Sequence, residues 1–142
     1  MKKLLFLLVI TFSVLMAKAD TISYWHVYYN DLCIAELNGH FSDTIISIKH
    51  ADIKKNDSIS IIFTNDYQCS YCSYTVSVFY GNKYIKSVTN NSNWPGRFSF
   101  SLLKLFEAVD LKKCRPLSFY YVQTSNEEKA SKPQLLFELF FK

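Results

Sequence analysis

Cys69 and Cys72 have the spacing most specific for chemistry in this chain, because two thiols with two residues between them can form a disulfide, bind a metal ion or exchange with other thiols. Redox enzymes of the thioredoxin type place the first of these cysteines at the start of a helix, whose amide groups lower the thiol pKa. Here residues 75–80 (TVSVFY) follow the motif and have the composition of a strand. A CxxC redox protein is therefore the less favoured alternative.

A tetrahedral metal site would have to combine Cys69 and Cys72 with Cys33, Cys114 or a histidine. Structural zinc sites usually consist of two pairs of closely spaced ligands, and the sequence contains one such pair. The three histidines are scattered over separate segments, at His26, His40 and His50. We therefore expect neither a metal ion nor another cofactor.

Disulfide formation is the interpretation of the cysteines that we favour. The ends of a four-residue turn lie within about 7 Å of each other, and this distance is close to the range that a disulfide spans. Cys69–Cys72 would then close a turn between two strands, and Cys33–Cys114 would join two segments that are distant in the sequence. Four cysteines allow three pairings, and sequence alone does not choose among them.

The first nineteen residues have the features of a secretory signal peptide. Lys2 and Lys3 precede an apolar run over residues 4–16, and residues 17–19 (AKA) form an A-x-A cleavage site before Asp20. The apolar run is shorter than the about 20 residues that a transmembrane helix needs. We expect cleavage after residue 19, no transmembrane segment in the remaining chain, and a secreted or periplasmic protein in a compartment where disulfides persist.

The charge of the exported chain argues against nucleic acid as its ligand. Loss of Lys2, Lys3 and Lys18 with the signal peptide reduces the 16 basic residues to 13, against 12 acidic residues. Binding to nucleic acid depends on a clustered basic surface, and the sequence has no long run of Lys or Arg. We expect no nucleic-acid partner.

Catalytic motifs are equally absent from the sequence. No pattern places a histidine beside a nucleophile or a carboxylate, and three dispersed glycines do not make a phosphate-binding loop. Four aspartates lie near the ends of expected strands, where Asp commonly stabilises turns: Asp43, Asp52, Asp57 and Asp66. We therefore expect no catalytic residues and do not expect an enzyme.

Alternation of apolar and polar residues predicts strands along most of the chain. The expected strands cover residues 24–29, 32–37, 46–49, 58–64, 74–80, 84–89, 98–100, 117–124 and 135–141. Residues 101–109 repeat apolar side chains at helical spacing, with Ser101 as the N-cap, and predict one short helix. Strands at intervals of about ten residues predict a single antiparallel β-sandwich domain over residues 20–142, of about eight to nine strands. The last strand is apolar on both faces, so we expect an interior position.

Aromatic residues are abundant, with 10 Tyr, 12 Phe and 2 Trp. We expect most of them in the core, although Tyr and Trp also mark binding surfaces. Residues 90–96 (NNSNWPG) form a polar loop with a large aromatic side chain, and the Cys69–Cys72 turn carries a tyrosine. The candidate contact residues are therefore Trp94, Asn91, Asn93 and Tyr71. In the competing interpretation, Trp94 covers the open end of the sandwich.

These patterns favour an exported, non-catalytic domain that binds a protein or a glycan. The alternative is a small inhibitor or immunity-like protein of an extracytoplasmic enzyme, because a disulfide-bonded turn is preorganised and lowers the cost of binding. Sequence patterns predict neither the identity of the ligand nor the oligomeric state.

Overall fold

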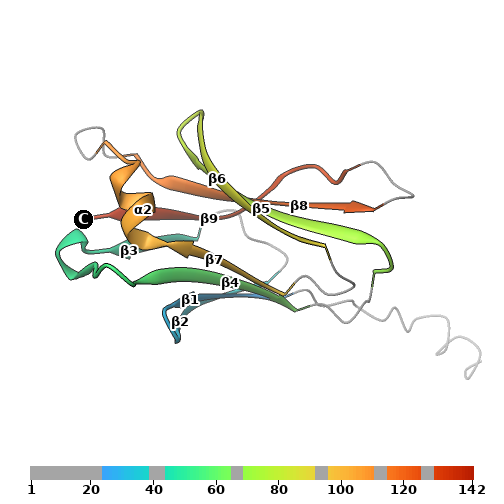
Figure 1. Cartoon of the computed structure of the whole chain (residues 1–142), viewed down its shortest axis with the longest axis horizontal. Coiled ribbons are helices and arrows are strands. Elements are labelled where there is room, and N and C mark those ends of the chain that lie inside the picture. The colour runs from blue at the N-terminus through green and yellow to red at the C-terminus, as the bar shows by residue number, and fades with distance from the viewer. Residues whose placement is uncertain (1–23, 39–43, 65–68, 92–95, 111–114, 126–129) are drawn as a thin grey trace, which may run out of the picture.

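The computed structural model describes residues 24–38, 44–64, 69–91, 96–110, 115–125 and 130–142. One sheet contains β1 (Tyr24–Tyr29), β2 (Leu32–Asn38), β4 (Ser58–Thr64) and β7 (Arg97–Ser101). The other contains β3 (Ile45–Ile48), β5 (Cys72–Tyr80), β6 (Lys83–Asn91), β8 (Leu117–Ser125) and β9 (Gln134–Phe141). The strand orders are β2-β1-β4-β7 and β3-β9-β8-β5-β6. The sheets lie face to face as an open sandwich (Figure 1), which confirms the predicted fold class.

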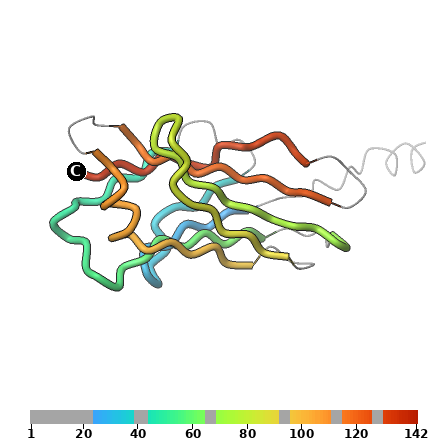
Figure 2. The backbone as a smooth tube through the Cα atoms, turned by 45° about the horizontal axis from the view of Figure 1, so that its top comes forward, coloured from blue at the N-terminus to red at the C-terminus, as the bar shows by residue number. Residues whose placement is uncertain are grey.

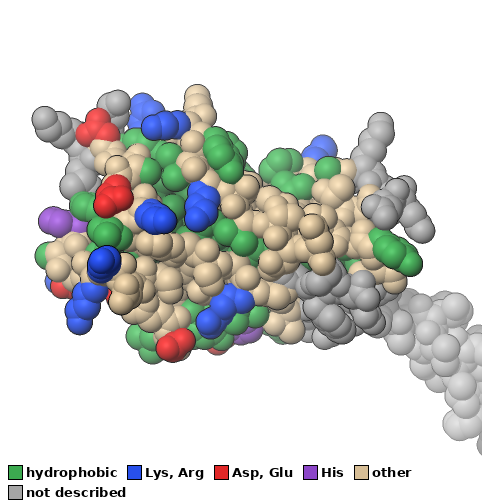
Figure 3. All heavy atoms as spheres, viewed as in Figure 1, with side chains coloured by type: hydrophobic (Ala, Val, Ile, Leu, Met, Phe, Trp, Pro, Cys, Tyr) green, Lys and Arg blue, Asp and Glu red, His purple; other side chains and the backbone are tan. Residues whose placement is uncertain are grey.

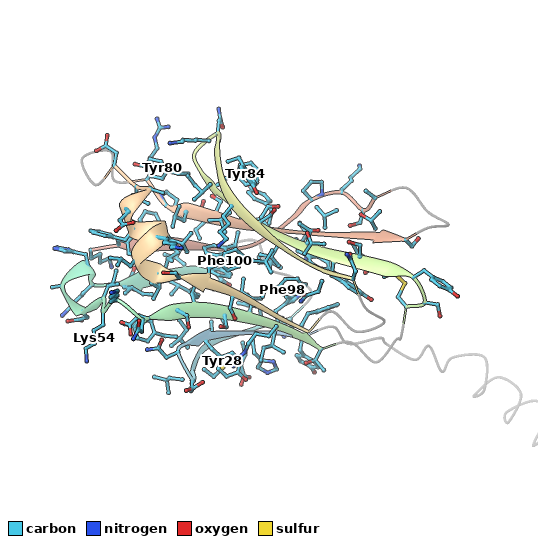
Figure 4. All side chains as sticks on the ribbon, in the orientation of Figure 1. Tyr28, Lys54, Tyr80, Tyr84, Phe98 and Phe100 are labelled. Carbon is cyan, nitrogen blue, oxygen red and sulfur yellow. A yellow bond between two sulfur atoms is a disulfide. The ribbon has the colours of Figure 1, made fainter. Side chains whose placement is uncertain are left out.

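The core forms where the apolar side of one sheet packs on the apolar side of the other. In β5, Tyr74, Val76 and Val78 are buried, and the residues between them are only partly buried. The same alternation in β7 buries Phe98 and Phe100 between the sheets (Figure 4). Period-two patterning therefore decides which face of each strand is removed from water.

One strand pair differs from the expected antiparallel arrangement. β3 pairs with β9 in the parallel direction, and Ile45 lies opposite Glu138. The neighbouring pairs β8–β9 and β5–β8 are antiparallel, as expected. β9 lies between β3 and β8, so the predicted interior position of the last strand is confirmed. The parallel pair joins strands that are far apart in the chain, and no hairpin turn signals such a pairing in the sequence.

The predicted helix is shorter than its sequence pattern. α2 covers Leu102–Glu107, and the hydroxyl of Ser101 accepts a hydrogen bond from the Lys104 amide at 3.5 Å, which confirms Ser101 as the N-cap. The helix ends at Glu107 because Ala108 forms the C-cap, its amide bonding back to the carbonyls of the last turn. A 3₁₀-helix, η1 (His50–Asp52), was not expected from the sequence.

The two ends of the sandwich carry different features. α2, η1 and the C-terminus lie at one end (Figures 1 and 2). There the His50 amide donates to the carbonyl of Lys142 at 2.8 Å, and the Lys142 amide donates to Ile48 at 2.9 Å. The start of β5 and the Cys69–Cys72 disulfide lie at the opposite end (Figure 4).

Candidate binding site

A disulfide closes the turn that leads into β5. Cys69 and Cys72 are bonded through their sulfur atoms, with 5.7 Å between their Cα atoms, as the spacing of the motif led us to expect. We call residues 69–72 the Cys69–Cys72 turn. Tyr71 lies at its tip in a left-handed conformation, with φ of 63°. A non-glycine residue adopts this conformation at a cost, so the surrounding covalent and packing constraints hold it there.

Tyr71 is the most exposed of the large apolar side chains among the described residues, at 77% exposure. The next most exposed is Leu32, at 68%. A side chain that is fixed at its backbone and open at its ring can bury apolar area in a partner without first ordering a loop. The Cys69–Cys72 turn therefore presents a preorganised contact residue.

The turn rests on a buried support. Cys72 is 4% exposed and belongs to the core. The side-chain amide of Gln123 donates to the sulfur of Cys72 at 3.3 Å, and the hydroxyl of Tyr121 donates to the Oε1 atom of Gln123 at 3.3 Å. These contacts connect the turn to β8, the strand paired with β5.

An aromatic cluster continues this support into the core. The ring of Trp25 stacks on Phe63 at 4.2 Å between centroids, and it meets the edge of Tyr121 at 4.4 Å. Tyr74 stacks beside Tyr121 at 6.4 Å. Burial raises the pKa of both tyrosines, so their hydroxyl groups stay neutral in ordinary buffers. Aromatic pairs of this kind add stability beyond the burial of their area, which makes this end of the sandwich a rigid base.

The predicted contact residues are only partly covered by the structure. Asn91 is the last residue of β6 and is exposed, and it lies opposite Ser73 of β5. Tyr71 precedes Ser73 by two residues, so both belong to the same end of the five-stranded sheet. Trp94 and Asn93 lie outside the described residues. Of the four candidates, the structure places Tyr71 and Asn91 near each other in the fold.

The second predicted disulfide lies partly outside the described residues. Cys33 is exposed on β2, and its thiol donates to the carbonyl of Ala35 at 3.6 Å. Cys33 forms no disulfide with another described cysteine. Cys114 is not among the described residues, so Cys33–Cys114 stays a prediction.

The two described histidines, His26 and His50, make contacts with other residues than cysteines. The Nε2 atom of His26 lies 4.0 Å from Glu36 on the outer face of the four-stranded sheet. The Nδ1 atom of His50 lies 2.9 Å from the carbonyl of Lys142, and its ring stacks on Phe106 at 5.9 Å. His40 is outside the described residues. Within the described part of the chain, no three His, Cys, Asp or Glu residues form a group that could hold a metal ion.

Two features were not predicted from the sequence. On the outer face of the four-stranded sheet, the guanidinium group of Arg97 lies 5.6 Å from the ring centre of Tyr28, which Figure 4 shows below the sheet. At the α2 end, the carboxylate of Asp57 accepts hydrogen bonds from Tyr29, Asn30 and Lys54. Both contacts join residues from separate segments, and local sequence patterns do not report such pairs.

The chain matches no protein-family model and no curated protein sequence. No helix among the described residues is long and apolar enough to cross a membrane.

Proposed function

We propose that the protein is an exported, non-catalytic binding domain that holds a partner protein through the Cys69–Cys72 turn. The side chain of Tyr71 enters a pocket of the partner, and Asn91 contacts the surface beside that pocket. The observation that carries this proposal is the 77% exposure of Tyr71 on a turn closed by a disulfide. Tyrosine is enriched among the residues that dominate protein–protein binding energy.

Preorganisation is the physical reason for assigning the contact to this turn. Ordering a side chain at an interface costs about 0.5–1.5 kcal/mol, and ordering a flexible loop costs more. The disulfide and the hydrogen bond from Gln123 to Cys72 fix the backbone of the turn before the partner binds, so the cost of ordering a loop is reduced. The free energy gained by burying the Tyr71 ring is then available for affinity.

The geometry favours a protein over a glycan as the partner. Sugar sites are commonly aromatic platforms flanked by polar side chains, and Trp94 was the residue predicted for such a platform. Tyr71 lies at the tip of a turn, and a single exposed ring there suits insertion into a concave surface. An inhibitor that enters the cleft of an extracytoplasmic enzyme is a specific form of this proposal, favoured by the same rigid turn.

The test compares immobilised wild-type protein with Tyr71→Ala and Tyr84→Ala variants. Tyr84 is a matched control, because it is a 54% exposed tyrosine on β6 outside the turn. Each protein is exposed to the secreted and envelope proteins of the organism that produces it, and the captured proteins are quantified by mass spectrometry. We expect one partner to be retained by the wild type and by Tyr84→Ala, and lost about thirtyfold from Tyr71→Ala. Equal retention by Tyr71→Ala, or capture of a glycan alone, contradicts the proposal.

Export is tested separately by the intact mass of the protein from its native host. A chain that begins at Asp20 agrees with cleavage of residues 1–19 as a signal peptide. A chain that retains residues 1–19 and is found in the cytoplasmic fraction contradicts export. That result would not test the role of Tyr71, which the binding experiment tests separately.

A further inference from the structure

A cleft lies where β6 and β7 meet α2, at the end of the sandwich away from the Cys69–Cys72 turn. Its volume is about 270 Å³. Apolar side chains come from all three elements, and one serine and two lysines complete the lining: Ile85, Phe100, Leu105, Ala108, Ser101, Lys86 and Lys104. Figure 3 shows Lys and Arg side chains in the region of α2 and β6, with acidic side chains nearby.

A β-bulge in β6 brings one of these lysines to the cleft. The pairing of β5 with β6 shifts between Val78 and Phe79, and Ile85 is the additional residue of β6. Because of this extra residue, Lys86 lies opposite Val78, whose side chain is fully buried between the sheets. Strict alternation without the bulge would place Lys86 opposite Ser77, on the outer face. Bulges commonly redirect a side chain in this way beside functional sites.

The second lysine lines the cleft from the helix. Lys104 is an exposed residue of α2, and Ala108 lies one turn further along. The described residues that line the cleft include no acidic one. Neither Lys86 nor Lys104 forms an ion pair with a carboxylate of the described residues. Within the described residues, the cleft therefore has two cationic groups and no carboxylate paired with them.

The floor of the cleft is apolar and belongs to the core. Phe100 is 1% exposed and Leu105 is 2% exposed, and both are among the lining residues. Because these two side chains are already covered, the apolar surface that a ligand would remove from water belongs mainly to the partly buried Ile85 and Ala108. Burial of such surface is favourable by about 25 cal/mol per Å². The chemistry that complements the whole cleft is an apolar chain that ends in an anion.

We propose that this cleft binds a small carboxylate with a short apolar chain. The chain lies against Ile85 and Ala108, above the floor formed by Phe100 and Leu105, and the carboxylate lies between the ammonium groups of Lys86 and Lys104. A volume of 270 Å³ corresponds to about nine water molecules, and hence to a ligand of about ten non-hydrogen atoms. This site is separate from the Tyr71 contact, because its β6 residues, Ile85 and Lys86, lie near the start of that strand and Asn91 lies at its other end.

The test uses three ligands of equal chain length that differ in charge: octanoate, octanol and octylammonium. Each is titrated into the isotope-labelled, disulfide-bonded protein at neutral pH and low salt, below its micelle concentration, and amide shifts are recorded by NMR. We expect octanoate to shift the amides of Ile85, Lys104 and Ala108. Two exposed charge contacts predict about tenfold tighter binding of octanoate than of octanol. Octylammonium should bind most weakly.

Variants separate the charge contribution from the apolar one. Lys86→Gln with Lys104→Gln should lower the affinity for octanoate to that for octanol, and leave octanol unchanged. Lys83→Gln is the matched control, because Lys83 is an exposed lysine of β6 outside the cleft, and it should change neither affinity. Ala108→Leu fills the cleft and should weaken octanoate and octanol alike.

Three results would overturn the proposal. Equal binding of the three ligands, or the absence of any saturable shift, removes the charge-selective site. Shifts confined to residues outside the cleft assign the ligand elsewhere. The third result is a double variant, Lys86→Gln with Lys104→Gln, that binds octanoate with unchanged affinity but self-associates. It would identify Lys86 as a charge that protects an edge strand from pairing with other chains.

Discussion

The hydroxyl of Tyr29, at the end of β1, donates a hydrogen bond to the carboxylate of Asp57, which directly precedes β4. The same carboxylate accepts from the side-chain amide of Asn30 at 3.1 Å and from the backbone amide of Lys54 at 2.8 Å. The carbonyl of Asp57 accepts from the amide of Leu102 at 2.9 Å, at the start of α2. One residue therefore joins the β1–β2 turn, the turn before β4 and the helix.

The charge of Asp57 should stabilise the fold against acid. The hydrogen bond from Tyr29, followed by those from Lys54 and Asn30, lowers the pKa of this carboxyl below its usual 3.8. A lowered folded-state pKa gives stability that is complete above pH 3.8 and lost as the pH falls through the folded-state value. We expect Asp57→Asn to be less stable than the wild type at neutral pH, and the difference to shrink in acid. Urea midpoints across this range test it, and a difference independent of pH contradicts it.

The alkaline limb of stability should depend on Tyr29. Its hydrogen bond to Asp57, then burial, then the charge of Asp57 raise the pKa of Tyr29 from 10.0 to about 12. This contribution is complete below pH 10.0 and is lost as the pH rises toward 12. Tyr29→Phe should lower the free energy of unfolding by about 1 kcal/mol at neutral pH, since the bond is partly exposed. It should also remove this part of the alkaline loss. An unchanged alkaline slope in urea unfolding would refute the assignment.

Asn30 offers a paired test of backbone and side chain. It has φ of 52°, and its Oδ1 atom accepts from the Ser58 amide at 2.9 Å. Asn30→Gly keeps the left-handed conformation and loses the side-chain bonds, which should cost about 1 kcal/mol. Asn30→Ala also has to adopt the left-handed conformation, and should cost about 1–2 kcal/mol more. Equal thermal stability of the two variants would show that the backbone conformation contributes nothing.

Removing the disulfide should affect binding more than folding. A bridge across four residues limits the unfolded chain little, so Cys69→Ala with Cys72→Ala should cost about 2 kcal/mol. The β-sandwich should persist, because the core on both sides of Cys72 is unchanged. Circular dichroism and thermal unfolding measure the stability, and capture of the partner measures the function. Full affinity in the folded double variant would mean that the disulfide does not preorganise Tyr71.

Sequence patterns predict the strands of this fold because each strand is half buried. Tyr74, Val76 and Val78 alternate with polar residues, so the pattern and the burial agree. The parallel pairing of Ile45 with Glu138 could not be predicted, since it depends on how distant strands meet. The predicted helix extends to Val109, two residues beyond its observed end at Glu107, because the apolar spacing continues after the backbone leaves the helical conformation.

The candidate site is predictable only in part. The cysteine spacing indicates the disulfide, and Tyr71 is identified with it. Asp57 joins several segments through its hydrogen bonds, and one of these comes from Tyr29, 28 positions earlier in the chain. The residues next to Asp57 in the sequence indicate only a turn. The position of Lys86 at the cleft could not be predicted either, because it depends on a β-bulge at Ile85 that the local sequence does not indicate.

The central claim is that Tyr71 contacts the partner, and site-specific photo-crosslinking tests it most directly. A photoreactive benzoylphenylalanine replaces Tyr71 in one protein and Tyr84 in another, and both are irradiated in the native extracytoplasmic environment. Both sites are exposed tyrosines, at 77% and 54% exposure, so each tolerates the substitution. We predict one crosslinked partner protein from position 71 and none from position 84. No crosslink at position 71, or the same products from both positions, would contradict the account.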